Sequence, residues 1–225
     1  MRHSISYAVL FALVLPGVSF AQEGFPRTIE HALGVTTIES KPERVVTWGW
    51  SVQDVVLDLD VVPVGMPSFA YGGGDDGVLP WTQAAIAERE VPIPVVFANT
   101  PEAPLEAIAA LDPDVIIAPY SGITAEEYEV LSAIAPVVAY PDKPWLIRWQ
   151  DVVTLTGNAL GEDEKAQALI SETEAFLREQ VAAYPDIEGT VFANIVNRND
   201  GQVSVRIAGD PRVQLFADVG MVPAP

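Results

Sequence analysis

Apolar and polar residues follow two patterns along this chain, one typical of buried strands and one typical of amphipathic helices. The clearest strand is the continuous apolar run at residues 115–118, which suits a parallel sheet covered on both faces. Leu105, Ile108 and Ala109 precede it with helical spacing, and Pro113 should end that helix because it has no N–H. The other expected strands are residues 44–47, 61–64, 94–97 and 137–139. This alternation predicts a Rossmann-like, mostly parallel α/β lobe over residues 43–141.

Two helix starts in this lobe carry capping signals. Ser51 precedes an apolar helical pattern, and Asp54 stands three residues later, so we expect a side-chain cap on a helix that ends near residue 59. Residues 124–127 read Thr-Ala-Glu-Glu, which is a capping-box sequence. The helix that follows should present Tyr128, Leu131 and Ile134 on one side.

The second half of the chain changes from alternating elements to helix alone. Residues 142–186 read as a connector helix with a break at Gly161, where a left-handed helix end is expected. Residues 187–225 then begin a second lobe, with a strand at 190–196, a turn at 199–201, a strand at 202–207 and a helix near 213–219. We interpret this second lobe as incomplete, and we expect its hairpin to leave an apolar face uncovered.

The N-terminus reads as an export signal. A short basic start is followed by an apolar run that is too short for a membrane anchor, and Ser19 and Ala21 place small residues before a cleavage site. We expect cleavage after Ala21, so that residues 1–21 form the signal peptide and residues 22–42 an N-terminal β-arm. The mature protein is then expected in the periplasm, not embedded in a membrane.

Composition narrows the function further. A formal net charge of −19 in 225 residues argues against nucleic acid and anionic membranes as partners. The chain has no cysteine and two histidines, too few for a transition-metal site, and we expect His31 to be a surface residue. Residues 72–77 match G-x-G-x-x-G only literally, because no strand-to-helix turn surrounds them, and we interpret them as the rim of a cleft.

Several segments together resemble a known family. They are residues 42–46 leading into a strand, residues 105–114 leading into the next, the connector helix, and residues 214–220. This combination resembles the periplasmic binding proteins that carry ferric siderophores and vitamin B12 to ABC permeases. The resemblance implies two lobes with the ligand in the cleft between them, no enzymatic activity and no cofactor of the protein's own. We expect a monomer whose partners are a ferric siderophore and the permease subunits.

Candidate ligand contacts follow from the same arrangement. Aromatic walls and guanidinium groups suit a ferric chelate, which presents flat apolar faces and peripheral charge. The expected contacts are aromatic residues at strand tips, two residues at the start of the connector, and an arginine at the second-lobe hairpin: Trp50, Tyr71, Trp81, Tyr120, Trp145, Arg148 and Arg206.

Each of these residues has a structural alternative. Each aromatic could serve ordinary packing, Arg148 could pair with Asp151, and Arg206, like Arg198, could be a solvated turn charge. Glu106 lies in a first helical turn, where the helix dipole alone stabilises it, but the resemblance implies that it docks on the permease.

The ligand itself is left open among a ferric siderophore, cobalamin and haem. Cobalamin is bulky and weakly charged, so it would depend on the aromatic residues and not on the arginines. A protein of another class, an exported hydrolase, would have to rely on His31 alone for a Ser–His–Asp arrangement.

Overall fold

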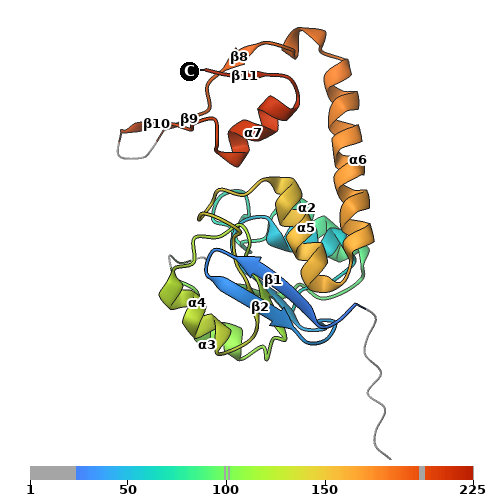
Figure 1. Ribbon diagram of the computed structural model, residues 1–225, viewed down its shortest axis with the longest axis vertical. Coiled ribbons are helices and arrows are strands. Elements are labelled where there is room, and N and C mark those ends of the chain that lie inside the picture. Colours follow the sequence, from blue (N-terminus) through green and yellow to red (C-terminus); the bar gives the residue numbers. More distant parts are fainter. Residues whose placement is uncertain (1–23, 99, 101, 198–200, 225) are drawn as a thin grey trace, which may run out of the picture.

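The computed structural model describes residues 24–98, 100, 102–197 and 201–224. Figure 1 shows a sheet lobe (β1–β7 with α1–α5) and a C-terminal segment (β8–β11 with α7), joined by the long helix α6. The expected leader with its cleavage site after Ala21, Arg198 and part of the turn at 199–201 lie outside the described residues.

A five-stranded parallel sheet forms the centre of the sheet lobe, in the order β5–β4–β3–β6–β7. The mixed α/β fold with a parallel sheet is therefore confirmed. The strands are β3 (Val45–Thr47), β4 (Gly65–Pro67), β5 (Val95–Phe97), β6 (Val115–Ile117) and β7 (Val137–Val138). The helices of this lobe are α1 (Val52–Asp58), α2 (Pro80–Glu88), α3 (Leu105–Ala109), α4 (Ala125–Ser132) and α5 (Trp149–Leu160).

Alternate residues of the central strands supply the cores on the two faces of the sheet. Val45, Val115 and Ile117 pack in one cluster with residues of α1, α5 and the start of α6. Val46 and Ile116 pack in a second cluster with residues of α3 and α4. All five side chains are fully buried, as the continuous apolar runs predicted.

The capping box at the start of α4 is confirmed. The Glu127 N–H donates to Thr124 Oγ1 over 3.2 Å, and the Thr124 N–H donates to Glu127 Oε2 over 2.8 Å. The expected cap of α1 is wrong. Ser51 adopts a left-handed conformation and makes no side-chain cap, while the Asp54 carboxylate turns to α2, where it accepts hydrogen bonds from Trp81 and Thr82.

The second expected strand is also displaced, since the structure places β4 at Gly65–Pro67 instead of residues 61–64. Pro63 has no N–H to donate to a ladder. The Val64 N–H makes one bond to the Val45 carbonyl, and regular pairing begins only at Gly65. A side chain at Gly65 would meet Phe97, so this strand also needs a glycine for close packing.

The N-terminal arm is a β-hairpin of β1 (Arg27–His31) and β2 (Gly34–Ile38). His31 is 9% exposed, so the expectation of a surface histidine is wrong. Its Nδ1 accepts from the Leu33 N–H, which leaves Nε2 to donate to Thr36 Oγ1, and Thr36 donates in turn to the Val137 carbonyl. Burial lowers the pKa of His31. The side chain therefore ties the hairpin to the sheet in its neutral form.

Two helices follow the sheet lobe. The helix α5 begins at Trp149, later than the expected start of the connector at residue 142, and Gly161 ends it in the left-handed conformation at φ 71°. The helix α6 (Asp163–Ala182) has 20 residues, but only Ala166 and Ile170 are buried. Its second half therefore leaves the sheet lobe and leads to the short 3₁₀ helix η1 (Pro185–Ile187). No helix within the described ranges has the length and apolarity needed to cross a bilayer.

The C-terminal segment departs from prediction at its first strand. The expected strand at 190–196 is two strands, because its ends pair with different partners. β8 (Val191–Phe192) pairs in parallel with β11 (Val222–Pro223), and β9 (Ile195–Asn197) forms the expected hairpin with β10 (Val203–Val205). The helix α7 (Pro211–Asp218) matches the predicted one. The expected uncovered apolar face is confirmed by the exposed side chains of Val191, Ile195, Val203, Val205 and Ile207.

Candidate functional site

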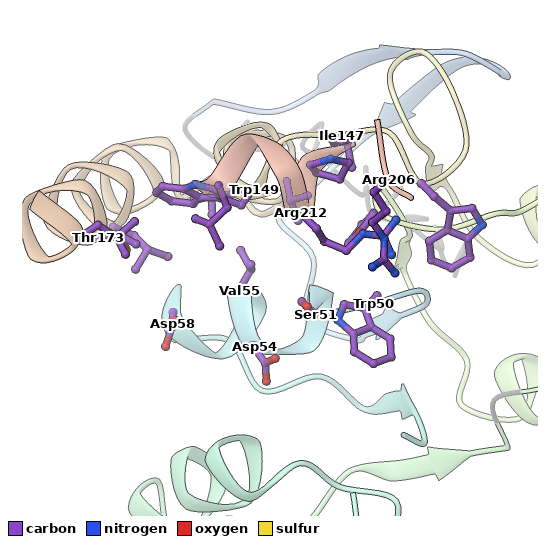
Figure 2. A pocket seen from close by; sticks show the side chains of 18 residues that line it. Trp50, Ser51, Asp54, Val55, Asp58, Ile147, Trp149, Thr173, Arg206 and Arg212 are labelled. Atoms are coloured by element: carbon purple, nitrogen blue, oxygen red, sulfur yellow. The ribbon is translucent and has the colours of Figure 1, made fainter. Parts of the chain in front are cut away.

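A cavity of about 830 Å³ lies between the sheet lobe and the C-terminal segment. We call it the cleft. The helices α1, α5 and α6 line one side, and Arg206 with α7 lines the other. Figure 2 shows its side chains, most of them apolar or aromatic: Trp50, Val55, Tyr120, Trp145, Ile147, Trp149, Val152, Val153, Leu169, Leu177, Pro211 and Leu215. Its polar members are Ser51, Asp54, Asp58, Thr173, Arg206 and Arg212.

The aromatic wall of the cleft is built at the carboxyl ends of neighbouring strands. Trp50 follows β3 and packs edge-on against Phe69, with 5.0 Å between ring centroids. Tyr120 follows β6 and packs edge-on against Trp145 at 5.7 Å. A side chain at Gly122 would stand 2.4 Å from Trp145 Nε1, so this glycine makes room for the indole. These contacts give a ligand flat and orientated surfaces.

The basic wall is organised by one buried carboxylate. Asp210 is 8% exposed and caps the N-terminus of α7 by accepting from the Arg212 N–H over 2.9 Å. Its two oxygens also accept from Arg212 Nε at 2.7 Å and Nη2 at 2.6 Å. Arg206 Nε lies 3.6 Å from the same carboxylate, and Arg206 Nη1 donates to Asn194 Oδ1 over 2.9 Å. Both guanidinium groups are thus held at the cleft.

The pKa values around this wall follow from burial and charge. Burial raises the pKa of Asp210, but the hydrogen bonds from Arg212 and the charge of Arg206 outweigh it, so the pKa lies below its ordinary value. The pKa of Arg212 is raised, chiefly by the hydrogen bonds to Asp210. Burial raises the pKa of the Tyr120 phenol. The cleft therefore presents charged arginines and a neutral tyrosine.

Two carboxylates of α1 form an acidic wall. Asp54 accepts from Trp81 Nε1 at 3.2 Å, from Gln53 Nε2 at 3.1 Å and from Thr82 Oγ1. Burial raises the pKa of Asp54 despite these donors. The pKa of Asp58 is raised by burial first and then by the negative charge of Asp54.

The structure brings four of the seven expected ligand contacts together in the cleft. These are Trp50, Tyr120, Trp145 and Arg206. Tyr71 is 87% exposed and Trp81 is 61% exposed, and neither lines the cleft, so the structure does not bring these two aromatics together with the other expected contacts. None of residues 72–77 lines the cleft either, which corrects their interpretation as its rim.

Arg148 also lies outside the cleft, and its partner differs from the expected one. Its Nη2 is 2.6 Å from Asp218 Oδ2 at the end of α7, instead of pairing with Asp151. This ion pair joins the start of α5 to the C-terminal segment. Glu106 is exposed in the first turn of α3, as expected.

Sequence reasoning missed the basic and acidic partners of the site. Arg212 and Asp210 could have been found, because Asp-Pro-Arg directly after a strand signals a capped helix start at a strand tip. Asp54 was noted only as a capping residue. Asp58, Trp149 and Leu215 carry no local signal for a ligand site.

Metal and hydrolase chemistry find no support among the described residues. No group of three or more histidine, cysteine, aspartate or glutamate side chains converges there as a metal site. The contacts of His31 are with Thr36, Leu33 and Tyr128, not with a serine and a carboxylate.

A parallel α/β lobe, a long connecting helix and a cleft between two parts of the chain define a ligand-binding protein of the cleft type. Residues 45–224 match the periplasmic binding protein family, and the chain belongs to that family.

Named relatives agree with this assignment. The chain is 30% identical over 189 residues to the ferric enterobactin-binding periplasmic protein FepB of Escherichia coli O6:H1, covering 79% of this chain and 57% of FepB. It is 36% identical over 130 residues to the Fe(3+) dicitrate-binding periplasmic protein FecB of Escherichia coli K12, covering 57% of this chain and 39% of FecB. The matches thus span 57% of the length of FepB and 39% of the length of FecB, less than two thirds of either relative.

Solved structures share the fold. PiaA of Streptococcus pneumoniae TIGR4, determined in complex with ferrichrome, superposes with a TM-score of 0.80 at 38% identity. The match covers 88% of this chain and 67% of the PiaA chain.

Proposed function

We propose that this protein captures a ferric siderophore in the cleft and delivers it to an ABC permease for iron uptake. The observation that carries the proposal is the joint presence of an aromatic wall (Trp50, Tyr120, Trp145) and two arginines held by Asp210 around one cavity of about 830 Å³. Aromatic faces suit the apolar body of such a chelate, and guanidinium donors suit its oxygen atoms. The ferric ligands for which FepB and FecB are named, and the ferrichrome bound to PiaA, support the same ligand class.

In this proposal iron is cargo, and the protein needs no cofactor of its own. The chelate arrives already wrapped around its metal, which agrees with a cleft lined by indoles and guanidinium groups instead of metal ligands. Capture takes place in the periplasm after removal of the leader. Glu106, exposed at the start of α3, is the proposed contact with a basic face of the permease.

The test is a titration of the full chain followed by intrinsic tryptophan fluorescence. Three of its five tryptophans, Trp50, Trp145 and Trp149, line the cleft, so a bound iron chelate should quench the signal. The panel is ferrichrome, ferric enterobactin, ferric dicitrate, haem and cobalamin. Saturable quenching by at least one ferric siderophore supports the proposal. Binding of haem or cobalamin but of no siderophore would overturn it in favour of a haem- or cobalamin-binding function.

A matched pair of aromatic variants then locates the site. Trp50→Ala removes a ring of the cleft and should weaken binding by about tenfold or more, since a stacked aromatic side chain buries a large apolar area. Tyr71→Ala removes a ring that stands outside the cleft and should leave the affinity near that of the parent. If the two variants weakened binding equally, the ligand would bind outside this cleft.

A further inference from the structure

We infer that the cleft selects ferric chelates without net charge, of the tris-hydroxamate class, and discriminates against trianionic tris-catecholate chelates. This inference rests on the proposed function, because it names the kind of siderophore that the cleft accepts. It follows from where the charges of the cleft lie and how many of them are already paired.

The basic wall has less charge to offer than its two arginines suggest. Asp210 receives both Nε and Nη2 of Arg212, at 2.7 and 2.6 Å, and lies 3.6 Å from Arg206 Nε. The single negative charge of Asp210 thus neutralises about half of the positive charge of the two arginines. The guanidinium N–H groups still donate hydrogen bonds, so the wall suits an oxygen-rich ligand better than a strongly anionic one.

The acidic wall acts against an anion from the other side. Asp54 and Asp58 line the cleft on α1, across from the arginines of the basic wall. Figure 2 shows their carboxylates turned away from those arginines, so they act on a bound anion by their charge and not by direct contact. Asp54 accepts hydrogen bonds from Trp81, Thr82 and Gln53, which are all neutral. The negative charge of Asp54 is therefore not cancelled by a cation. The positive charge of Arg89 acts on Asp58, but Arg89 also lies 3.8 Å from Asp60 and is shared with that carboxylate.

The charges around the cleft together disfavour an anionic ligand. Among the described residues that line the cleft, two arginines are matched by two aspartates, and Asp210 behind the arginines adds a third carboxylate. The charges that line the cleft surround one cavity of about 830 Å³, and the screening length at physiological salt is about 8–10 Å, so salt does not fully screen their interaction with a bound chelate. The formal charge of −19 on the whole chain has the same sign as this local excess. A trianionic chelate is therefore repelled on balance.

An uncharged chelate meets no such penalty. Its apolar scaffold can lie against Trp50, Tyr120 and Trp149, and its hydroxamate oxygens can accept from the arginine N–H groups without bringing extra charge into the cleft. The same cleft that is poor for a polyanion is thus well suited to a neutral, oxygen-lined iron complex.

The experiment compares ferrichrome, an uncharged ferric tris-hydroxamate, with ferric enterobactin, a trianionic tris-catecholate, on the full chain. Affinities are measured by fluorescence quenching at low and at moderate ionic strength. We expect ferrichrome to bind at least about tenfold more tightly, and we expect added salt to narrow the ratio because it screens the repulsion. Two charge-neutralising variants show whether the effect is local: Asp58→Asn in the cleft, and Glu129→Gln on the exposed side of α4.

Each outcome decides a different point. A ratio that falls about fivefold in Asp58→Asn but not in Glu129→Gln supports the inference, because only the first charge lies in the cleft. Ferric enterobactin binding as tightly as ferrichrome overturns the inference and leaves the proposed function standing. A ratio that both variants change equally, or that neither changes, assigns the preference to something other than the cleft charges and also overturns the inference. Binding of neither chelate overturns the inference, and binding of no ferric siderophore at all, ferric dicitrate included, overturns the proposed function as well.

Discussion

Asp210 serves two purposes in this structure, and two substitutions separate them. Asparagine keeps the helix cap of α7, because asparagine and aspartate are equally good N-caps, but it removes the charge that holds Arg206 and Arg212. Alanine removes both. The Asp210→Asn and Asp210→Ala variants therefore differ by the cap alone.

The structure sets the size of each effect. The Arg212 side chain is 46% exposed, so its pair with Asp210 is screened, and we expect Asp210→Asn to cost about 0.2–1 kcal/mol. Loss of the cap in Asp210→Ala adds about 1 kcal/mol. In a chain of this length, 1 kcal/mol corresponds to a shift of about 2–4 °C in Tm. The alanine variant should therefore melt about 2–4 °C below the asparagine variant in a thermal scan.

The pH dependence provides a second check with a definite sign. The folded-state pKa of Asp210 is lowered, so the charge contributes stability above the ordinary carboxyl pKa, and this is lost as pH falls through the folded-state value. The stability difference between the parent and Asp210→Asn should stay constant from neutral pH to about pH 5 and disappear in stronger acid. A difference that grows on acidification, or equal melting of the two variants, would refute the roles given to this carboxylate.

Two further substitutions test residues outside the cleft. Arg148→Ala removes the ion pair with Asp218 and should cost at most about 1 kcal/mol of stability, while the affinity for ferrichrome stays within about twofold of the parent. An affinity loss of about tenfold with unchanged Tm would show that Arg148 contacts the ligand. Glu106→Arg should abolish uptake in cells while ligand affinity and Tm remain near those of the parent, because Glu106 is exposed at the start of α3 and stands outside the cleft. Glu172→Arg, on the exposed side of α6, is its matched control and should leave uptake intact; transport that survives Glu106→Arg would make Glu106 only a helix-end carboxylate.

The elements that the sequence predicts well are those whose stability is local. The apolar run at β6 requires burial on both faces, and the capping box of α4 is complete within four residues. Both are formed as expected. Gly161 likewise ends α5 in the left-handed conformation, which glycine adopts without steric cost.

The errors arise where a distant partner decides the outcome. Ser51 has the sequence of a helix cap, but the carboxylate of Asp54 is better satisfied by Trp81 and Thr82 on α2, almost thirty residues away. The strand expected at 190–196 divides because β8 pairs with β11 and β9 with β10. His31 resembles a surface residue in sequence and is buried only because the hairpin folds onto β7.

The same distinction explains why only part of the candidate site was predictable. Aromatic residues at strand tips can be recognised from the sequence, because parallel strands bring their carboxyl ends to one edge. That argument finds Trp50 and Tyr120. It cannot place Arg212 opposite them, because the distance between the two walls depends on the connection between the two parts of the chain.

That connection is α6, and its length controls the site. A helix of 20 residues spans about 30 Å at 1.5 Å per residue, and it carries the chain from the sheet lobe to the C-terminal segment (Figure 1). Leu169, Thr173 and Leu177 line the cleft from successive turns, so the helix is both the spacer and part of the wall. Because a helix is stiffer than a loop, α6 limits how far the aromatic wall and the basic wall can move apart. Binding energy then goes to the ligand instead of ordering the connection, which is the advantage of a preorganised cleft.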